Sequence, residues 1–513
     1  MRAASGARRA LLGALWLSTT GYMTFALNFG VTLVLVRFLF PKDFGQFALA
    51  SSLVDLLSIV TAFSFSQGII QMRDAPNVSE TAYVLSRRLY WWMLAGGVVL
   101  CGVLSRHYPG PFIPLFFSLF AVRNLTLFSY VYQAQLEKEF AYNPVSIVRL
   151  VTSLLSIIVA LGLARAGAGV WSLLGREVML SGVALIGNRI ASRWRYRGGY
   201  NHETARRLWQ FGWQMFVTRG LETLWYRADT ALLGVLSGTV VLGFYDRARY
   251  LAEFGHYIVS FGAVQVAYPV YARLQGRADA VAYAYRLTHG LLVRLMFPVL
   301  IWLALFPHEL VGLLYGAGTR WDETATILPW LAIFGFVYPV AENVKVLLTG
   351  IGRIEQAVRF RVVQLAVSLP LLVPAIHQWG ATGAAGVMTL SEVVGLGSSY
   401  LSLRREIGSL ALGGYVRPAV AAVVAGGAIA LSRTWHVLPW TGRAGFAASL
   451  AASGALYVVC LLIFDRQQLQ EHLLALVAAF QGEALPTRAA EPGASNGQVP
   501  DAAADPVGSD DPR

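Results

Sequence analysis

The chain has 513 residues, of which 56% are hydrophobic and 13% are charged, whereas soluble domains carry about 25% charged residues. A soluble protein of this composition could not cover its surface, so the sequence excludes an ordinary soluble enzyme or binding module. The formal net charge is +13. In a soluble chain this charge would suggest a nucleic-acid partner, but here we expect none and attribute it to basic connections on one side of a membrane.

The apolar residues form successive blocks of about 20 residues, the length that spans a bilayer core of about 30 Å. Each block must be helical, because lipid offers no hydrogen-bond partner to an open backbone. The first block follows three arginines and runs on to Phe40 without a small-residue cleavage signature, so we interpret it as an uncleaved span. We predict fourteen spans, over residues 12–39, 45–70, 83–105, 112–135, 143–164, 168–190, 209–235, 241–267, 286–306, 324–349, 356–376, 380–402, 415–432 and 443–464.

The connections between the spans predict the orientation. Even-numbered connections, counted with the span ends that adjoin them and with the two termini as far as Arg466, hold 23 Lys and Arg residues, against 7 in the odd-numbered connections counted in the same way. Because positive residues concentrate on the cytoplasmic side, we expect a multi-pass membrane protein with both termini in the cytoplasm. The most basic connection, 189–207, either lies on anionic lipid headgroups or contributes to a substrate entrance. A short interfacial helix over 465–480 and a disordered tail from about 482 are expected to follow the last span.

An internal repeat divides the spans into two halves. At an offset of 198 residues, spans one and two align with spans seven and eight, and Gly45 falls on Gly243. Six helices in each half give both halves the same orientation, and transporters commonly bind substrate between such halves. We therefore expect an all-α membrane protein of two six-helix lobes related by a pseudo-twofold axis. The expected boundaries are 1–192 for the N-lobe, 193–208 for a basic cytoplasmic linker, 209–405 for the C-lobe, 406–465 for two additional spans and 466–513 for the cytoplasmic tail.

Apart from the basic residues counted with the connections, seventeen charged residues fall inside the predicted spans, where a central charge costs about 2.5–3.5 kcal/mol. They must be paired, lie near the helix ends or line a wet cavity. Glu342 and Lys345, like Arg219 and Glu222, are three residues apart and can pair along one helix, while Arg247 and Arg249 are expected to snorkel. The candidate cavity residues are Arg123, Arg149, Arg176, Arg219, Glu222, Tyr226, Asp229 and Lys345.

Three of these arginines are candidate ligands for an anion. Arg123 and Arg149 have no acidic residue within one turn on their own helices, and Arg176 has only Glu177, which points elsewhere on the helix. The guanidinium group offers a planar fork of donors that suits phosphate oxygens. The alternative for each is an ion pair with a neighbouring helix, and the residues alone leave both open.

Several kinds of catalytic and metal site are missing from the sequence. There is no Gly-x-x-x-x-Gly-Lys-Ser/Thr loop, no His-Glu-x-x-His pair and no Asp-x-Asp site for a sugar nucleotide. Cys101 and Cys460 lie in apolar blocks without the spacing of a zinc site or a disulfide framework. We therefore expect a transporter rather than an enzyme, with no cofactor and no metal.

Several stretches of the chain resemble the bacterial O-antigen and polysaccharide flippases, a branch of the multidrug/oligosaccharidyl-lipid/polysaccharide exporter superfamily. The similar stretches occur in the same order over about 35–465, at residues 34–71, 132–160, 227–254, 347–353 and 379–387. The resemblance implies two six-helix lobes around a central cleft, usually with two extra helices. By position, Asp229 matches an acidic residue of the family, Gly243, Tyr245 and Arg249 match a following connection, and Gly350 and Gly352 match a turn after span ten. The resemblance also allows Asp229 to be a structural partner within the membrane.

The resemblance implies a flippase of the bacterial inner membrane that moves undecaprenyl-diphosphate-linked oligosaccharide from the cytoplasmic to the periplasmic leaflet by alternating access. The implied partners are this lipid-linked substrate and the membrane lipids. A polysaccharide polymerase and glycosyltransferases that act in the same polysaccharide biosynthesis are further implied partners. Two alternatives stay open: a cation-coupled exporter of small molecules from the same superfamily, and an integral-membrane polysaccharide polymerase. The absence of a long outer connection disfavours the polymerase.

Overall fold

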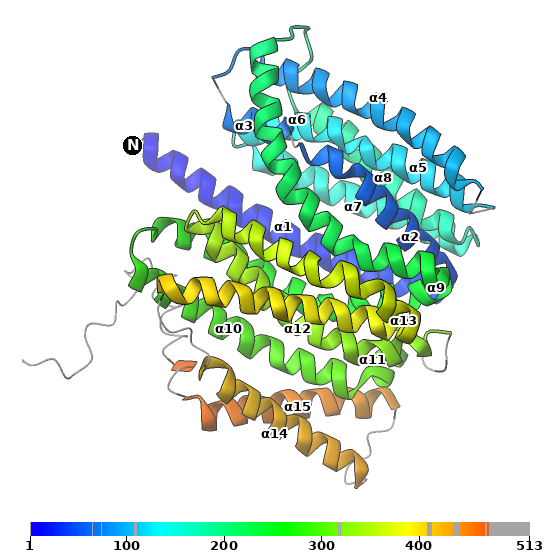
Figure 1. Cartoon of the computed structure of the whole chain (residues 1–513), viewed down its shortest axis with the longest axis vertical. Coiled ribbons are helices and arrows are strands. Elements are labelled where there is room, and N and C mark those ends of the chain that lie inside the picture. Colours follow the sequence, from blue (N-terminus) through cyan, green and yellow to red (C-terminus); the bar gives the residue numbers. More distant parts are fainter. Residues whose placement is uncertain are drawn as a thin grey trace, which may run out of the picture. The chain divides into compact units, whose positions relative to one another are not determined.

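The computed structural model describes the backbone of residues 2–470, apart from residues 64, 73, 107–109, 317, 319, 408–412, 436–441 and 467–468. Most of the expected interfacial helix at 465–480 and the whole expected tail from 482 lie outside the described residues. The described residues contain helices and no strand (Figure 1). The helices are α1 (Arg2–Phe38), α2 (Pro41–Leu57), η1 (Ser58–Phe63), α3 (Phe65–Gln71), α4 (Val78–Leu104), α5 (Phe112–Asn124), α6 (Thr126–Lys138), α7 (Tyr142–Arg165), α8 (Val170–Ala191), α9 (His202–Arg273), α10 (Ala278–Leu305), α11 (Pro307–Tyr315), α12 (Asp322–Gly350), α13 (Ile354–Ile407), α14 (Gly413–Thr434) and α15 (Gly442–Phe464).

Two of the helices fold back on themselves at a glycine. Helix α9 breaks at Gly238, with φ 84°, and α13 breaks at Gly380, with φ 56°. Both values lie in the left-handed region that favours glycine because it lacks a Cβ atom. Each helix therefore provides two of the predicted spans, 209–235 and 241–267 in α9 and 356–376 and 380–402 in α13.

The number of spans agrees with the prediction. Eleven helices within the described residues are long and apolar enough to cross a membrane. Counting α9 and α13 twice and adding α4, whose 27 residues cover the expected third span, gives fourteen. The prediction of a polytopic all-α membrane protein is confirmed.

The predicted internal repeat is visible in a reciprocal contact between α2 and the second arm of α9. A Cβ atom added to Gly45 would overlap the carbonyl oxygen of Thr239, and one added to Gly243 would overlap that of Pro41. Residues 41 and 239, like residues 45 and 243, are separated by the repeat offset of 198. Reciprocal contacts of this kind are what a twofold relation produces, so Gly45 and Gly243 lie beside the pseudo-twofold axis.

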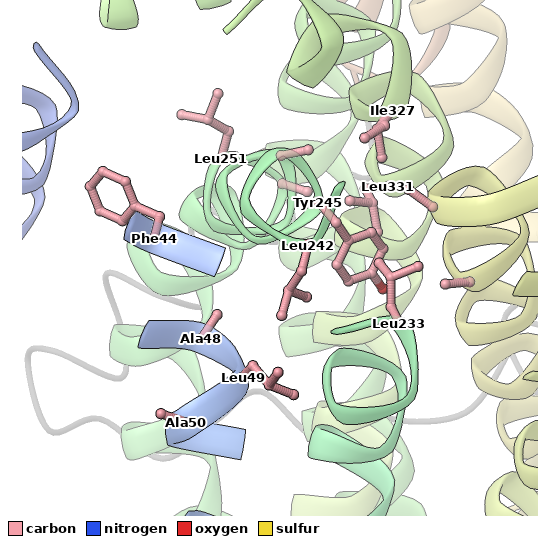
Figure 2. Close-up of a cluster of buried hydrophobic side chains, with 14 of the residues drawn as sticks. Phe44, Ala48, Leu49, Ala50, Leu233, Leu242, Tyr245, Leu251, Ile327 and Leu331 are labelled. Atoms are coloured by element: carbon pink, nitrogen blue, oxygen red, sulfur yellow. The ribbon is translucent and has the colours of Figure 1, made fainter. Parts of the chain in front are cut away.

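The largest core surrounds this contact. Figure 2 shows side chains of α2, α9 and α12 packed together, with Leu49 from α2, Tyr245 from α9 and Leu331 from α12, each fully buried. Helix α1 packs on α7, and its Phe29 ring stacks on Phe254 of α9 with 4.1 Å between the ring centroids. Helices α2 and α1 thus connect the two halves of the repeat.

The expected linker at 193–208 is only partly a linker. Residues 193–201 are not helical, but α9 begins at His202, and its Ala205 and Leu208 are buried with Phe63 and Val131 of the first half. The first turns of α9 therefore belong to the core of the N-terminal half. Helices α14 and α15 form another core with α10, as the expectation of two additional spans requires. The lobe boundaries themselves remain a prediction.

Candidate functional site

Three cavities follow one another between helices of the two halves. The first, the α1 cavity, has a volume of about 530 Å³ between α1, α7 and α9. The second, the central cavity, has a volume of about 480 Å³ between α2, η1, α6, α9, α12 and α13. The third, the α6 cavity, has a volume of about 330 Å³ between η1, α3, α4, α6 and α9. The α1 and central cavities share Tyr226 and Arg227, and the central and α6 cavities share Thr61, Tyr130 and Arg219. These shared residues make one series of hollows.

The 3₁₀ segment η1 explains part of this series. It interrupts the second predicted span between α2 and α3, and short 3₁₀ stretches within a helical span often mark functional sites. Its Ser58, Ile59 and Thr61 line the central cavity, and Thr61 also lines the α6 cavity. The break in the helix thus lies at the wall of both cavities.

Arg123 lies in an ion-pair network instead of at a cavity wall. Its NH1 atom is 2.8 Å from Asp55 Oδ1 and its Nε atom is 3.2 Å from Glu177 Oε2, while the other oxygen of Asp55 is 2.8 Å from Arg227. Arg123 is not among the residues that line the three cavities. Its acidic partners come from α2 and α8, which the sequence could not place beside it. Arg123 therefore forms ion pairs with neighbouring helices, which is the alternative to a role as an anion ligand.

A second network fixes the two arms of α9 to each other. Asp229 is fully buried and pairs with Arg249, while Tyr245 donates a hydrogen bond of 2.5 Å to the same carboxylate. Arg249 also pairs with Glu253 at 2.8 Å, and Glu253 accepts a hydrogen bond from Tyr226. Asp229 is the partner within the membrane that the resemblance allowed.

The expected snorkelling of Arg247 and Arg249 is wrong. The Arg249 side chain is 7% exposed and pairs inside the protein. Arg247 pairs with Asp246 at 2.5 Å and lies over the Phe44 ring. Both have acidic partners within reach on α9, and such pairing offsets the desolvation of a buried guanidinium.

A third network joins α9, α12 and α13. Lys345 pairs with Glu342 at 2.8 Å, as its spacing predicted, and with Glu222 at 2.7 Å. Arg361 lies 3.4 Å from Glu342 and 3.8 Å from Glu222. Because Glu222 faces Lys345, it makes no ion pair with Arg219 in the described residues, and that expectation is wrong.

Arg361 is the cavity residue that sequence reasoning missed. It lines the central cavity, its side chain is 5% exposed, and its guanidinium lies over the Trp225 ring at 4.3 Å. Arg361 is one of the 23 basic residues counted with the cytoplasmic connections, although it falls inside the predicted span 356–376. Its position inside that span, away from the first residues, was the feature of the sequence that could have identified Arg361 as an intramembrane residue.

Three of the basic candidate residues, Arg149, Arg176 and Arg219, make no ion pair with the described residues. Arg149 lines the α1 cavity and Arg219 lines both the central and the α6 cavities. Arg176 donates a hydrogen bond of 2.5 Å to Asn28, which lines the α1 cavity, and its buried Nε donor has no partner. By contrast, the carboxylates that line the α1 and central cavities are each paired with a base; they are Asp55, Glu222, Asp246 and Glu253.

The cavities therefore offer unpaired positive charge beside hydroxyl and aromatic groups. Tyr22, Tyr226, Tyr250 and Tyr257 line the α1 cavity, and tyrosine presents both an apolar ring and a polar tip. No group of three or more His, Cys, Asp or Glu residues that could hold a metal ion occurs in the described part of the chain. The arrangement can hold an anion with an attached polar or amphipathic body.

Comparisons with known proteins agree with this arrangement. Residues 34–326 match the family described as polysaccharide biosynthesis protein. The succinoglycan biosynthesis transport protein ExoT of Rhizobium meliloti (strain 1021) is 22% identical over 343 residues, which are 66% of this chain and 68% of the relative.

Solved structures with the same fold are transporters. The lipid II flippase MurJ, in an inward closed conformation, has a TM-score of 0.72 at 11% identity over 89% of this chain and 100% of that one. An inward-facing multidrug resistance transporter of the MATE family has a TM-score of 0.59 at 16% identity over 75% and 94%. A transporter of the same superfamily from Pyrococcus furiosus, described as having a binding pocket of reverse polarity, has a TM-score of 0.53 at 14% identity over 77% and 95%. At these identities the likeness shows the fold.

The family match extends over more than half of the 513 residues. The transport relative and the fold shared with solved transporters agree with the family resemblance found in the sequence. The protein therefore belongs to the polysaccharide biosynthesis protein family.

Proposed function

We propose that the protein flips an undecaprenyl-diphosphate-linked oligosaccharide from the cytoplasmic to the periplasmic leaflet of the bacterial inner membrane by alternating access. The observation that carries the proposal is the pair of unpaired guanidinium groups, Arg149 and Arg219, on two cavities that share Tyr226 and Arg227. A diphosphate matches the donor fork of arginine. The hydroxyl, amide and tyrosine groups that surround it suit an oligosaccharide.

The charge balance favours an anion over the alternative, a cation-coupled exporter of small molecules. A cation site needs an acidic group that is free to bind it. The carboxylates at the walls of the α1 and central cavities are already held by bases, as the pairs of Asp55 with Arg227 and Glu253 with Arg249 illustrate. The charges left over at the walls of these two cavities are positive, whereas the α6 cavity also has Glu137, which accepts a hydrogen bond from Gln133. An integral-membrane polymerase has no specific observation in its favour.

Alternating access requires that one end of the pathway closes while the other opens. The close approach of Gly45 and Gly243 joins the two halves at the ends of α2 and α9 that the charge bias predicts to be periplasmic. This supports a state closed on the outer side. The proposed orientation places both termini in the cytoplasm, where glycosyltransferases would supply the substrate. A polymerase would use the exported unit on the other side.

The experiment compares three substitutions in cells that lack their own copy of the protein. Arg149→Ala should abolish glycan export while the protein still inserts and accumulates, because a side chain that binds the diphosphate is lost. Arg149→Lys should retain part of the activity, since it keeps the charge but not the fork. Arg165→Ala, an exposed change at the end of the same helix, is the matched control and should export normally. Normal export by Arg149→Ala would refute the proposed role of the α1 cavity.

A further inference from the structure

One acidic residue inside the spans differs from all the others. Of the eight acidic residues within the predicted spans, seven pair with a base in the described structure. The exception is Glu392, on the second arm of α13. It is 1% exposed, makes no ion pair with the described residues, and its buried Oε2 atom has no hydrogen-bond partner. Neither the ion-pair networks nor the proposed anion site uses this carboxyl group.

The surroundings of Glu392 contain one guanidinium group that is already engaged. The charged and titratable groups that face its carboxyl are Arg361 from the first arm of α13 and Tyr338, Glu342 and Lys345 from α12. Arg361 donates to Gln364 at 2.6 Å and lies near Glu342 and, from α9, Glu222. The Nε2 donor of Gln364 is itself buried without a partner. Arg361 therefore lies between paired acids on one side and an unpaired acid on the other.

An ionised carboxylate without a counter-ion is unfavourable in a buried site, and the group avoids that cost by holding a proton. We propose that Glu392 is a proton-binding site, and that its proton decides whether Arg361 is available to an anion in the central cavity. Arg361 and Glu222 both line that cavity. This proposal depends on the proposed function in one respect, namely that the anion is the diphosphate of the substrate.

Binding of the proton and binding of the anion are linked because Glu392 and the anion would both interact with the same guanidinium group, that of Arg361. When Glu392 is protonated, Arg361 stays with Glu342 and Glu222 at the cavity wall. When Glu392 is ionised, it attracts Arg361 away from the cavity, because a buried charge seeks its nearest opposite charge. Anion affinity is then high below the titration of Glu392 and falls as the pH rises through it. By reciprocity, an anion bound to Arg361 favours the proton on Glu392.

The first test needs no ligand. Infrared spectra of the purified full-length protein across a pH series should contain the carbonyl band of a buried protonated carboxyl group. The band should disappear in Glu392→Gln, whose side chain has nearly the same shape, and remain in Glu323→Gln, which neutralises an exposed acid at the start of α12. If the wild-type protein has no band that the Glu392→Gln change removes, the carboxyl is ionised and the proton site is refuted.

The second test measures binding of farnesyl diphosphate by calorimetry in the same pH series. The wild-type dissociation constant should increase with pH, by at most about tenfold per pH unit for one linked proton. Glu392→Gln should bind as tightly as the wild type does at low pH and follow only the titration of the diphosphate itself. Arg361→Gln should keep the infrared band but bind weakly at every pH. Glu323→Gln should reproduce the wild-type profile.

The outcomes separate the two proposals. Parallel pH profiles for the wild type and Glu392→Gln, with the infrared band present, would refute the link between Glu392 and Arg361. Failure of farnesyl diphosphate to bind any variant at any pH would contradict the proposed anion site, and with it that link. The infrared result would still decide whether Glu392 holds a proton, because that measurement involves no ligand.

Discussion

At the scale of single residues, the protein places most of its intramembrane charge in pairs that bridge different helices or different arms of a helix. Asp229 and Arg249 are 20 residues apart in the chain but meet inside the fold, and the Asp55 carboxylate lies between Arg123 and Arg227. Pairing offsets desolvation. It also leaves the few unpaired groups, such as Arg149, as the ones free to act on a ligand.

The buried pair of Asp229 and Arg249 should contribute far more to stability than an exposed pair. Asp229→Ala leaves a buried guanidinium with Glu253 as its remaining acidic partner, and breaking a buried pair typically costs about 3–5 kcal/mol. The midpoint of thermal unfolding in detergent should therefore fall strongly. Glu203→Gln breaks the exposed pair of Glu203 with Arg207, which is worth about 0.2–1 kcal/mol, and should shift the midpoint little. Equal shifts of the unfolding midpoint in the two variants would mean that the buried pair contributes no more to stability than the exposed pair.

At the scale of helices, the α2 and α9 contact combines close packing with the symmetry of the repeat. Neither Gly45 nor Gly243 can accept a Cβ atom without displacing the backbone of the other helix. Two backbones that approach so closely form a compact contact of small residues, as membrane helices commonly do. If the lobes separate here during transport, this contact closes the outer end of the pathway.

Enlarging Gly45 should hold the outer end open. In a background without Cys101 and Cys460, Gly45→Leu should let a membrane-impermeant thiol reagent added from the periplasm label Tyr257→Cys, since Tyr257 lines the α1 cavity. Glycan export should fall, because the closed state is no longer accessible. Gly96→Leu is the control, since a Cβ at Gly96 meets nothing within 4 Å. Labelling that is the same in both variants would show that the contact is not a gate.

At the scale of the whole molecule, the predicted orientation follows from where basic residues lie between the spans. The bias of 23 against 7 depends on the number of spans, and the fold-backs at Gly238 and Gly380 preserve that number. The basic connection that follows α8 is packed on the protein, with Arg87 of α4 over the Tyr196 ring. One side of the membrane should therefore carry the larger and more basic connections.

Reporter fusions test this orientation directly. A fluorescent protein that matures only in the cytoplasm should fluoresce when it is fused after Arg195, Gly276 or Arg466. A phosphatase that folds only in the periplasm should be active after Lys42 or Arg320. The alternation follows from fourteen spans with both termini inside. Two sites that report the opposite side would contradict the fourteen-span topology.

The sequence by itself determined the features that depend on composition and period. The apolar blocks required membrane helices, because their backbones have no other way to satisfy hydrogen bonds in lipid. The repeat offset predicted that Gly45 and Gly243 occupy equivalent places, and the spacing of Glu342 and Lys345 predicted their pairing. These inferences succeed because each rests on local geometry or on a pattern that repeats along the chain.

Only the tertiary structure decided which charges are free. Arg123 and Arg149 look alike in the sequence, since neither has an acidic neighbour on its own helix. The fold gives Arg123 the carboxylates of Asp55 and Glu177 from other helices, and it gives Arg149 a cavity. In the same way Arg361 becomes a cavity residue, and Glu392 is left without a base. Ion pairing between helices depends on distances across the bundle, and the sequence of one helix carries no record of them.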